Sequence, residues 1–156
     1  KEMMPDNIGE YRIPLGIPEI MNEGSDITLV TYGSTVRIAQ DAVSQLAKHG
    51  ISAELIDVQT LVPFDIQGII KESIKKTSRL LLIDEDVPGG TTAYMMQEIL
   101  EKQGGWQFLD SPPHTLTGKE HRPAYTSDGD YFSNPNAEDI FDAVFSVMKE
   151  ASPQTY

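Results

Sequence analysis

The stretch Ile27-Thr28-Leu29-Val30-Thr31-Tyr32-Gly33-Ser34 decides the fold of this chain. Its first six residues are mostly β-branched or aromatic and follow the turn residues Gly24-Ser25-Asp26, which predicts a strand. Gly33 and Ser34 then open a helix, with Ser34 or Thr35 as the N-cap. Apolar residues recur on one face of that helix at three-to-four spacing: Val36, Ala39, Val43 and Leu46. A strand that leads directly into an amphipathic helix is the first half of a βαβ unit.

The same strand-then-helix unit recurs along the chain. Further strands are predicted at Ala53–Val58, Leu80–Ile83 and His114–Thr117, with a short one around Ile17–Met21. Further helices are predicted after the cap Asp65 with Ile66, Ile70 and Ile74 on one face, after Gly89–Thr92, and from Asn134-Pro135 onward. Strands that alternate with helices imply right-handed crossovers and a mostly parallel sheet covered on both sides, which is an α/β fold.

Composition narrows the classes of partner. The chain has 156 residues, enough for one domain, with 24 acidic against 12 basic side chains and a net charge of −12. Such a chain repels phosphate backbones and anionic lipid, so we expect no nucleic-acid partner and no membrane partner. Cysteine is absent, which excludes disulfides and thiolate chemistry and fits a cytoplasmic location. Because the first residue is Lys1, we expect this sequence to be a piece of a longer protein.

Two segments at predicted strand–helix junctions are candidates for ligand binding, because ligands of open α/β sheets bind beyond the carboxyl ends of the strands. Asp84-Glu85-Asp86 could hold Mg²⁺, but adjacent residues of an extended chain point in different directions, which favours a solvated loop. Gly89–Thr92 could cradle an anion on backbone amides. It lacks the lysine of a phosphate-binding loop, so a tight turn with a threonine cap is the favoured interpretation.

The remaining candidate residues form no catalytic set. His49, His114 and His121 are the only histidines, and none has a neighbour at metal-ligand spacing. Trp106 and Phe108 could anchor a partner protein, although a core role is more common for such residues. The residues alone therefore predict no catalytic, cofactor-binding or metal-binding side chain.

A series of short motifs also occurs in a characteristic order between residues 11 and 125. They are Tyr11–Gly16, Glu23–Gly33, Glu54–Asp57, Thr60–Asp65, Lys75–Leu80, Phe108–Pro112 and Leu116–Gly118. In this order they resemble the β chain of the thiamine-dependent first component of 2-oxo acid dehydrogenases, where its C-terminal domain begins. The resemblance implies a transketolase C-terminal type of domain, which is a three-layer α/β/α sandwich on a five-stranded, mainly parallel sheet.

The same resemblance implies a role in assembly. Thiamine diphosphate and Mg²⁺ would bind on other domains of the parent enzyme, and the catalytic histidine would lie upstream of Lys1. This domain would build the subunit interface, including a homodimer contact, and dock the basic helical domain of the lipoyl acyltransferase core. Asp110 matches the aspartate of the family's Phe-Leu-Asp-Ala-Pro motif, which makes it the predicted partner-binding residue.

The chain departs from the family pattern at two places. Gly90-Thr91-Thr92-Ala93-Tyr94 replaces a Gly-x-Gly-Ala-Glu motif, and the run after Gly118 leads into an unusual acidic loop, Tyr125–Asn134. These departures leave open which 2-oxo acid the parent enzyme uses. The alternatives are the C-terminal domain of a transketolase or deoxyxylulose-phosphate synthase relative, and a stand-alone anion-binding module that uses Gly89–Thr92.

The predicted organisation has three parts. Residues 1–24 form an extended connecting segment, residues 25–150 form the transketolase C-terminal-like domain, and residues 151–156 form a tail.

Overall fold

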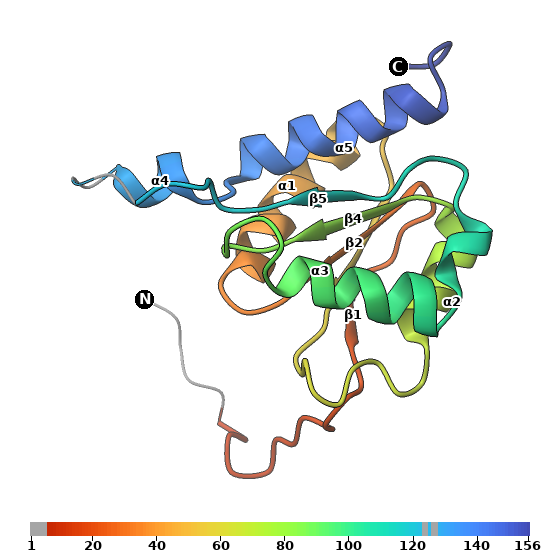
Figure 1. The fold of residues 1–156 in the computed structure, drawn as a ribbon. Helices are drawn as coiled ribbons and strands as arrows, with labels where there is room; N and C mark the ends of the chain where they lie inside the picture. Colours follow the sequence, from red (N-terminus) through yellow and green to blue (C-terminus); the bar gives the residue numbers. More distant parts are fainter. Residues whose placement is uncertain (1–5, 123–124, 126–127) are drawn as a thin grey trace.

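The computed structural model describes residues 6–122, 125 and 128–156, and these residues form one five-stranded sheet (Figure 1). In chain order the strands are β1 (Glu19–Asn22), β2 (Ile27–Thr31), β3 (Ala53–Asp57), β4 (Leu80–Ile83) and β5 (His114–Leu116). Their order in the sheet is β1-β3-β2-β4-β5. Only the β1–β3 pair is antiparallel, and the other three pairs are parallel. This confirms the predicted mainly parallel, five-stranded α/β fold.

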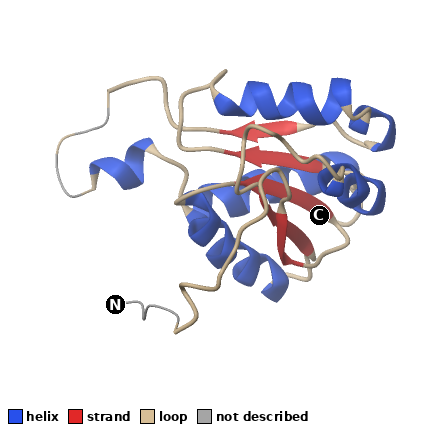
Figure 2. Cartoon of the chain, turned by 90° about the horizontal axis from the view of Figure 1, so that it is seen from below, coloured by secondary structure: helices blue, strands red, loops and turns tan. Residues whose placement is uncertain are grey.

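Helices cover both faces of the sheet. The bounds are α1 (Thr35–Lys48), α2 (Ile69–Thr77), α3 (Thr91–Met96), the π-helix η1 (Gln97–Lys102), the 3₁₀ helix η2 (Gly105–Phe108), α4 (Gly129–Ser133) and α5 (Ala137–Ala151). Residues of α1 and α5 pack in one core cluster, and residues of α2, α3 and η1 pack in a second cluster on the other face. Figure 1 shows α5 above the strands and α3 below them, and Figure 2 shows the strands between helices from another side. These are the three predicted layers.

The central strand β2 is buried along its whole length. Its side chains alternate between the two clusters: Ile27 and Leu29 face α1 and α5, while Val30 faces the opposite layer. Thr28 also points to that opposite layer, where its hydroxyl lies 2.6 Å from the Ser73 hydroxyl and 2.7 Å from that of Thr77, both in α2. Burial on both faces explains why the predicted strand reads as a nearly continuous β-branched and apolar run.

The predicted start of the second helix is wrong in one respect. Helix α2 begins at Ile69, and Ile66, which was predicted to lie on its buried face, is 63% exposed. The intervening Gly68 adopts the left-handed conformation (φ 69°), which lets the chain turn before the helix starts. Asp65 nevertheless caps the helix, because its carboxylate accepts hydrogen bonds from the backbone N–H groups of Ile69 and Ile70 at 2.8 and 3.0 Å.

The last helix also begins later than predicted. Asn134 and Pro135 precede it, and its N-cap is Asn136, which forms a capping box with Asp139. The predicted acidic loop Tyr125–Asn134 contains the short helix α4, while its residues 126–127 lie outside the described residues. Strand β1 lies within residues 1–24, the segment that was predicted to connect this domain to the preceding one. The predicted bounds of the domain and of its two flanking segments stay predictions.

A buried ion pair fixes α2 to the sheet. Glu54 of β3 is 1% exposed, and its carboxylate accepts hydrogen bonds from the Lys76 ammonium of α2 and from the backbone N–H of Gly24. Burial alone would raise the pKa of Glu54, but the hydrogen bonds from Lys76, Ser73 and Gly24 outweigh it and hold the pKa below its ordinary value of 4.5. The pair therefore stabilises the fold above that pH, and its contribution is lost as the pH falls through the folded-state pKa.

We predict that Lys76→Met lowers the free energy of unfolding at neutral pH by about 1–3 kcal/mol, since it leaves a buried carboxylate without its cation. This is less than for a fully buried pair, because the Lys76 side chain is 42% exposed and partly screened. The acid unfolding midpoint should shift to higher pH. Urea unfolding over a pH series measures both effects.

The control is Lys75→Met, which breaks an exposed pair with Glu72 and should lower the free energy of unfolding by less than about 1 kcal/mol. Equal losses for the two variants would contradict a buried ion pair.

Candidate functional site

The carboxyl ends of β2 and β4 meet at the point where the crossovers reverse direction. The loop after β2 leads to α1 on one face of the sheet, whereas the loop after β4 leads to α3 on the other face. Such a switch point is the usual position for a ligand in an open α/β sheet. Polar residues follow both strands here: Tyr32 and Ser34 after β2, and Asp84 and Glu85 after β4.

A hydrogen-bond network joins these two loops. The Tyr32 hydroxyl lies 3.0 Å from Asp84 Oδ1 and 3.0 Å from Thr91 Oγ1, at the start of α3. Since a phenol has one proton, Tyr32 donates to the carboxylate and is placed to accept from the threonine. Burial raises the pKa of Tyr32 above its ordinary value of 10.0, and the Asp84 carboxylate raises it further. Tyr32 therefore stays protonated as a donor to Asp84.

Asp84 is the least ordinary group of this network. It is 2% exposed, and its Oδ2 atom has no hydrogen-bond partner among the described residues. A buried carboxylate with only one hydrogen-bonded oxygen lowers the free energy of unfolding, because the charge loses its hydration without full compensation by hydrogen bonds. The position thus carries a local cost in stability of the kind found at functional sites.

The acidic triplet does not converge on a metal ion. Asp84 points to Tyr32, whereas Glu85 accepts from the Ser34 hydroxyl at 2.6 Å and Asp86 accepts from the Val87 N–H at 2.8 Å. Within the described part of the chain, no three histidine, cysteine, aspartate or glutamate side chains are placed to hold a metal ion. The predicted solvated loop is right for Glu85 and Asp86, which are exposed, and wrong for the buried Asp84.

The glycine turn at Gly89–Thr92 has a structural explanation. Gly89 has a φ of 84°, and a Cβ atom at Gly90 would collide with the Asp86 carboxylate. That carboxylate beside the turn disfavours a bound anion. The predicted threonine cap is wrong, because Gly90 is the N-cap and the Thr91 hydroxyl contacts Tyr32 instead.

Each of the three histidines lies in a separate setting. His49 is the C-cap of α1 and contacts the ring of Phe141, with centroids 5.2 Å apart. His114 Nε2 lies 3.1 Å from Glu150 Oε2, and His121 Nδ1 lies 2.8 Å from the Arg122 carbonyl oxygen. This arrangement brings no histidine into the switch-point network.

Asp110, the predicted partner-binding residue, lies away from this network, in the segment that precedes β5. Its Oδ2 accepts a hydrogen bond from Arg79 Nη2 at 2.9 Å, and its N–H donates to the Ser78 carbonyl at 2.9 Å. The carboxylate therefore ties this segment to the α2–β4 turn, and its side chain remains 44% exposed. No local pattern links Asp110 to Arg79, which lies 31 residues away.

The two aromatic residues predicted as anchors differ in environment. Trp106 of η2 is 64% exposed, whereas Phe108 packs against the second core cluster. Trp106 and Asp110 lie on the same short stretch of chain, so an exposed aromatic and an exposed carboxylate are close in sequence on one surface loop.

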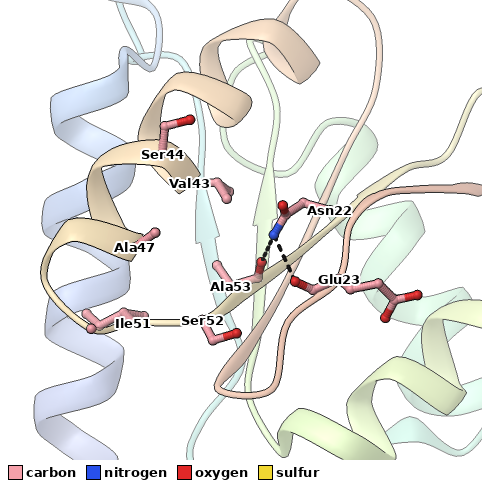
Figure 3. A pocket seen from close by; sticks show the side chains of 9 residues that line it. Asn22, Glu23, Val43, Ser44, Ala47, Ile51, Ser52 and Ala53 are labelled. Atoms are coloured by element: carbon pink, nitrogen blue, oxygen red, sulfur yellow. Dashed lines mark hydrogen bonds between the residues drawn. The ribbon is translucent and has the colours of Figure 1, made fainter.

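A separate cavity of about 500 Å³ lies between α1 and the strands β1 and β3 (Figure 3). The Asn22 side-chain amide donates to the carbonyl oxygens of Ala53 and Glu23 at 2.8 and 2.9 Å, which fixes one wall. Glu23 is the only ionisable residue in its lining. This cavity therefore offers no set of groups for catalysis or metal binding.

Comparison with known proteins identifies relatives of this chain. Residues 16–140 match the family model described as the C-terminal domain of transketolase. The chain is 31% identical over 140 residues to a pyruvate dehydrogenase E1 component subunit beta of Rhizobium meliloti, covering 90% of this chain and 30% of that protein. It is 45% identical over 140 residues to a mitochondrial 2-oxoisovalerate dehydrogenase subunit beta 2 of Arabidopsis thaliana, covering 89% and 38%. The chain thus spans about a third of the length of these relatives.

Solved structures give the same fold. A split-gene transketolase, described as an inactive β4 tetramer, has a TM-score of 0.71 at 22% identity, covering 91% of this chain and 45% of that one. A transketolase of Pichia stipitis has a TM-score of 0.57 at 15% identity, covering 85% and 18%. At these identities the likeness establishes the fold alone.

We predict that Tyr32→Phe lowers the free energy of unfolding by about 1–3 kcal/mol, because it leaves buried Asp84 without its donor. Asp84→Asn should be neutral or stabilising, since it keeps an acceptor for Tyr32 and removes the buried charge. Tyr94→Phe is the control: its hydroxyl donates to the Leu61 carbonyl at 2.9 Å, and losing this neutral bond should cost about 1 kcal/mol. Urea unfolding of the three variants measures these differences. A loss on Asp84→Asn as large as that on Tyr32→Phe would show that the charge itself is stabilised.

The glycine turn yields a second prediction. If Gly89–Thr92 is structural, inorganic phosphate should leave the melting temperature unchanged, because a ligand stabilises only by binding the folded state. Differential scanning fluorimetry measures the melting temperature in phosphate and, as the control, in sodium chloride at equal ionic strength. A saturable rise with phosphate would support the anion-binding alternative.

Proposed function

The chain belongs to the transketolase C-terminal domain family, and we propose that it is the assembly and docking domain of a thiamine diphosphate-dependent 2-oxo acid dehydrogenase. The parent enzyme would decarboxylate a 2-oxo acid and transfer the acyl group to a lipoyl arm. The observation that carries this proposal is the 31–45% identity to β subunits named for pyruvate and 2-oxoisovalerate dehydrogenases over about nine-tenths of the chain. The transketolase alternative is supported by solved structures whose sequences are less than 25% identical to this chain, and such a likeness supports the fold alone.

We propose that thiamine diphosphate and Mg²⁺ bind elsewhere in the parent enzyme. The cofactor's diphosphate needs cationic or amide donors, and its Mg²⁺ needs converging oxygen ligands. The glycine turn lies beside the Asp86 carboxylate, and the carboxylates of Asp84, Glu85 and Asp86 point to separate partners. These residues do not fit the cofactor, so we assign this chain no chemical step.

We place the docking surface at Trp106 and Asp110. Exposed tryptophan is enriched among the residues that dominate protein interfaces, and Trp106 is 64% exposed. Asp110 has one oxygen engaged by Arg79, which orients the carboxylate while its exposed side can accept a charge-assisted hydrogen bond from a basic partner. The net charge of −12 would steer such a partner toward the domain.

The partner proposed for this surface is the docking domain of the lipoyl acyltransferase core. The same proposal includes contacts with the other dehydrogenase subunits, among them a homodimer contact. It also includes a cytoplasmic location. Among the described residues no helix is both long and apolar enough to span a membrane.

We predict that Asp110→Asn accelerates dissociation from the docking domain by about tenfold, because it removes the charge from an interfacial hydrogen bond. Surface-plasmon resonance of the assembled dehydrogenase on the docking domain measures this rate. The free energy of unfolding should fall by about 1 kcal/mol, since the Asp110 side chain is 44% exposed while Arg79, at 15%, keeps its hydrogen bond to the Asp26 carbonyl.

Two further variants sharpen this test. Trp106→Ala should also accelerate dissociation and has no ion pair to lose, so it separates docking from folding. Asp142→Asn, which removes an exposed charge on α5, should leave dissociation unchanged. Unchanged dissociation of Asp110→Asn with lowered stability would mean that Asp110 serves only the Arg79 contact.

A further inference from the structure

An apolar patch is exposed where the N-terminal segment meets the loop between β3 and α2. The Gly16 carbonyl accepts a hydrogen bond from the Ile66 N–H at 2.9 Å, and a Cβ atom at Gly16 would lie 2.8 Å from the Pro63 ring. Leu15 and Val62, which are chain neighbours of Gly16 and Pro63, are 71% and 79% exposed, and Ile66 is 63% exposed. We call Leu15, Val62 and Ile66 the β3–α2 patch.

The segment that leads to the patch extends its apolar surface. Every residue from 6 to 15 is exposed. Tyr11 and Ile13 precede Leu15 at two-residue spacing, and both are large side chains that remain about half exposed. In Figure 1 this segment runs below the sheet and passes the loop between β3 and α2. Contiguous exposed apolar side chains of this kind mark a surface that another protein surface covers.

We propose that the β3–α2 patch and residues 11–15 are covered by the cofactor-binding domain of the same parent chain. The inference rests on the proposed function, because it takes this chain to be one domain of a longer dehydrogenase subunit. The relatives have room for such a domain. This chain covers only 30% and 38% of the two β subunits compared above, so most of each relative lies outside the match.

The chemistry of the patch favours this occupant over the basic docking domain of the acyltransferase core. A basic domain is attracted by carboxylates, whereas Leu15, Val62 and Ile66 are aliphatic. The core of a lasting interface is more apolar and less charged than that of a transient one. The patch therefore has the composition of a permanent contact within the enzyme.

Two further observations favour the same chain over a second copy. The connecting segment itself carries Leu15, so a domain attached through it meets the patch at an effective concentration in the millimolar range. A second copy has no such tether. It would also bring a second net charge of −12 to the contact, which opposes self-association.

The first experiment places a photo-cross-linker at the most exposed position of the patch, as Val62→p-benzoylphenylalanine in the parent chain. We expect cross-links to peptides of the cofactor-binding domain, with the mass of a single chain on a denaturing gel. The control is Phe145→p-benzoylphenylalanine, on α5 in the opposite layer of the fold. It should give no cross-link to that domain.

The second experiment compares the parent chain with the 156-residue chain alone. Val62→Ser/Ile66→Ser should change the melting temperature of this chain by less than about 1 °C, because both side chains are exposed in it. The same variant should lower the melting temperature of the parent chain by at least about 3 °C, because there it disrupts a buried contact. Val87→Ser, at an exposed position outside the patch, is the control and should have a similarly small effect in both forms.

Three results would overturn the inference. A cross-link that doubles the mass would assign the patch to another subunit. Cross-linking confined to this domain would leave the patch uncovered in the parent enzyme. Equal losses of melting temperature in the two forms would show that the patch serves only the fold of this domain. None of these results affects the docking test at Asp110, whereas a parent chain without a cofactor-binding domain would contradict the proposed function as well.

Discussion

Burial of both faces of β2 is the constraint on which the rest of the structure depends. Every residue of this strand is buried, so helices must cover it above and below. Helices α1 and α5 cover Ile27 and Leu29, while α2 covers Val30 and satisfies the Thr28 hydroxyl. Because β3 and β4 flank β2 on opposite sides, the crossovers must reverse direction at this strand. The loops after β2 and β4, which carry Tyr32 and Asp84, therefore lie side by side at the carboxyl ends of these strands.

Local sequence patterns predicted most of the fold. The run Ile27–Tyr32 predicts β2 because burial on both faces requires an apolar, β-branched strand. The three-to-four spacing of apolar residues predicts α1, and Asn134-Pro135 predicts a helix close to where α5 lies. The starts of α2 and α5 were less accurate, since a left-handed Gly68 and a capping box at Asn136 decide them. These depend on backbone geometry that residue spacing does not reveal.

The contacts of the candidate sites could not be predicted in this way. Tyr32 and Asp84 are 52 residues apart, and Arg79 and Asp110 are 31 residues apart. Such pairs meet only when the sheet has formed, so no local pattern signals them. The sequence placed Asp110 on a motif, and the structure adds Arg79, an intramolecular partner that any docking contact must share.

We propose that this chain supplies assembly while the cofactor binds on other domains. A calorimetric titration of thiamine diphosphate with Mg²⁺ into the chain tests this proposal most directly. The carboxylates of the β4–α3 loop are dispersed to separate partners, and one of them lies beside the glycine turn. We therefore expect no saturable heat. Micromolar binding of one cofactor per chain would contradict the account.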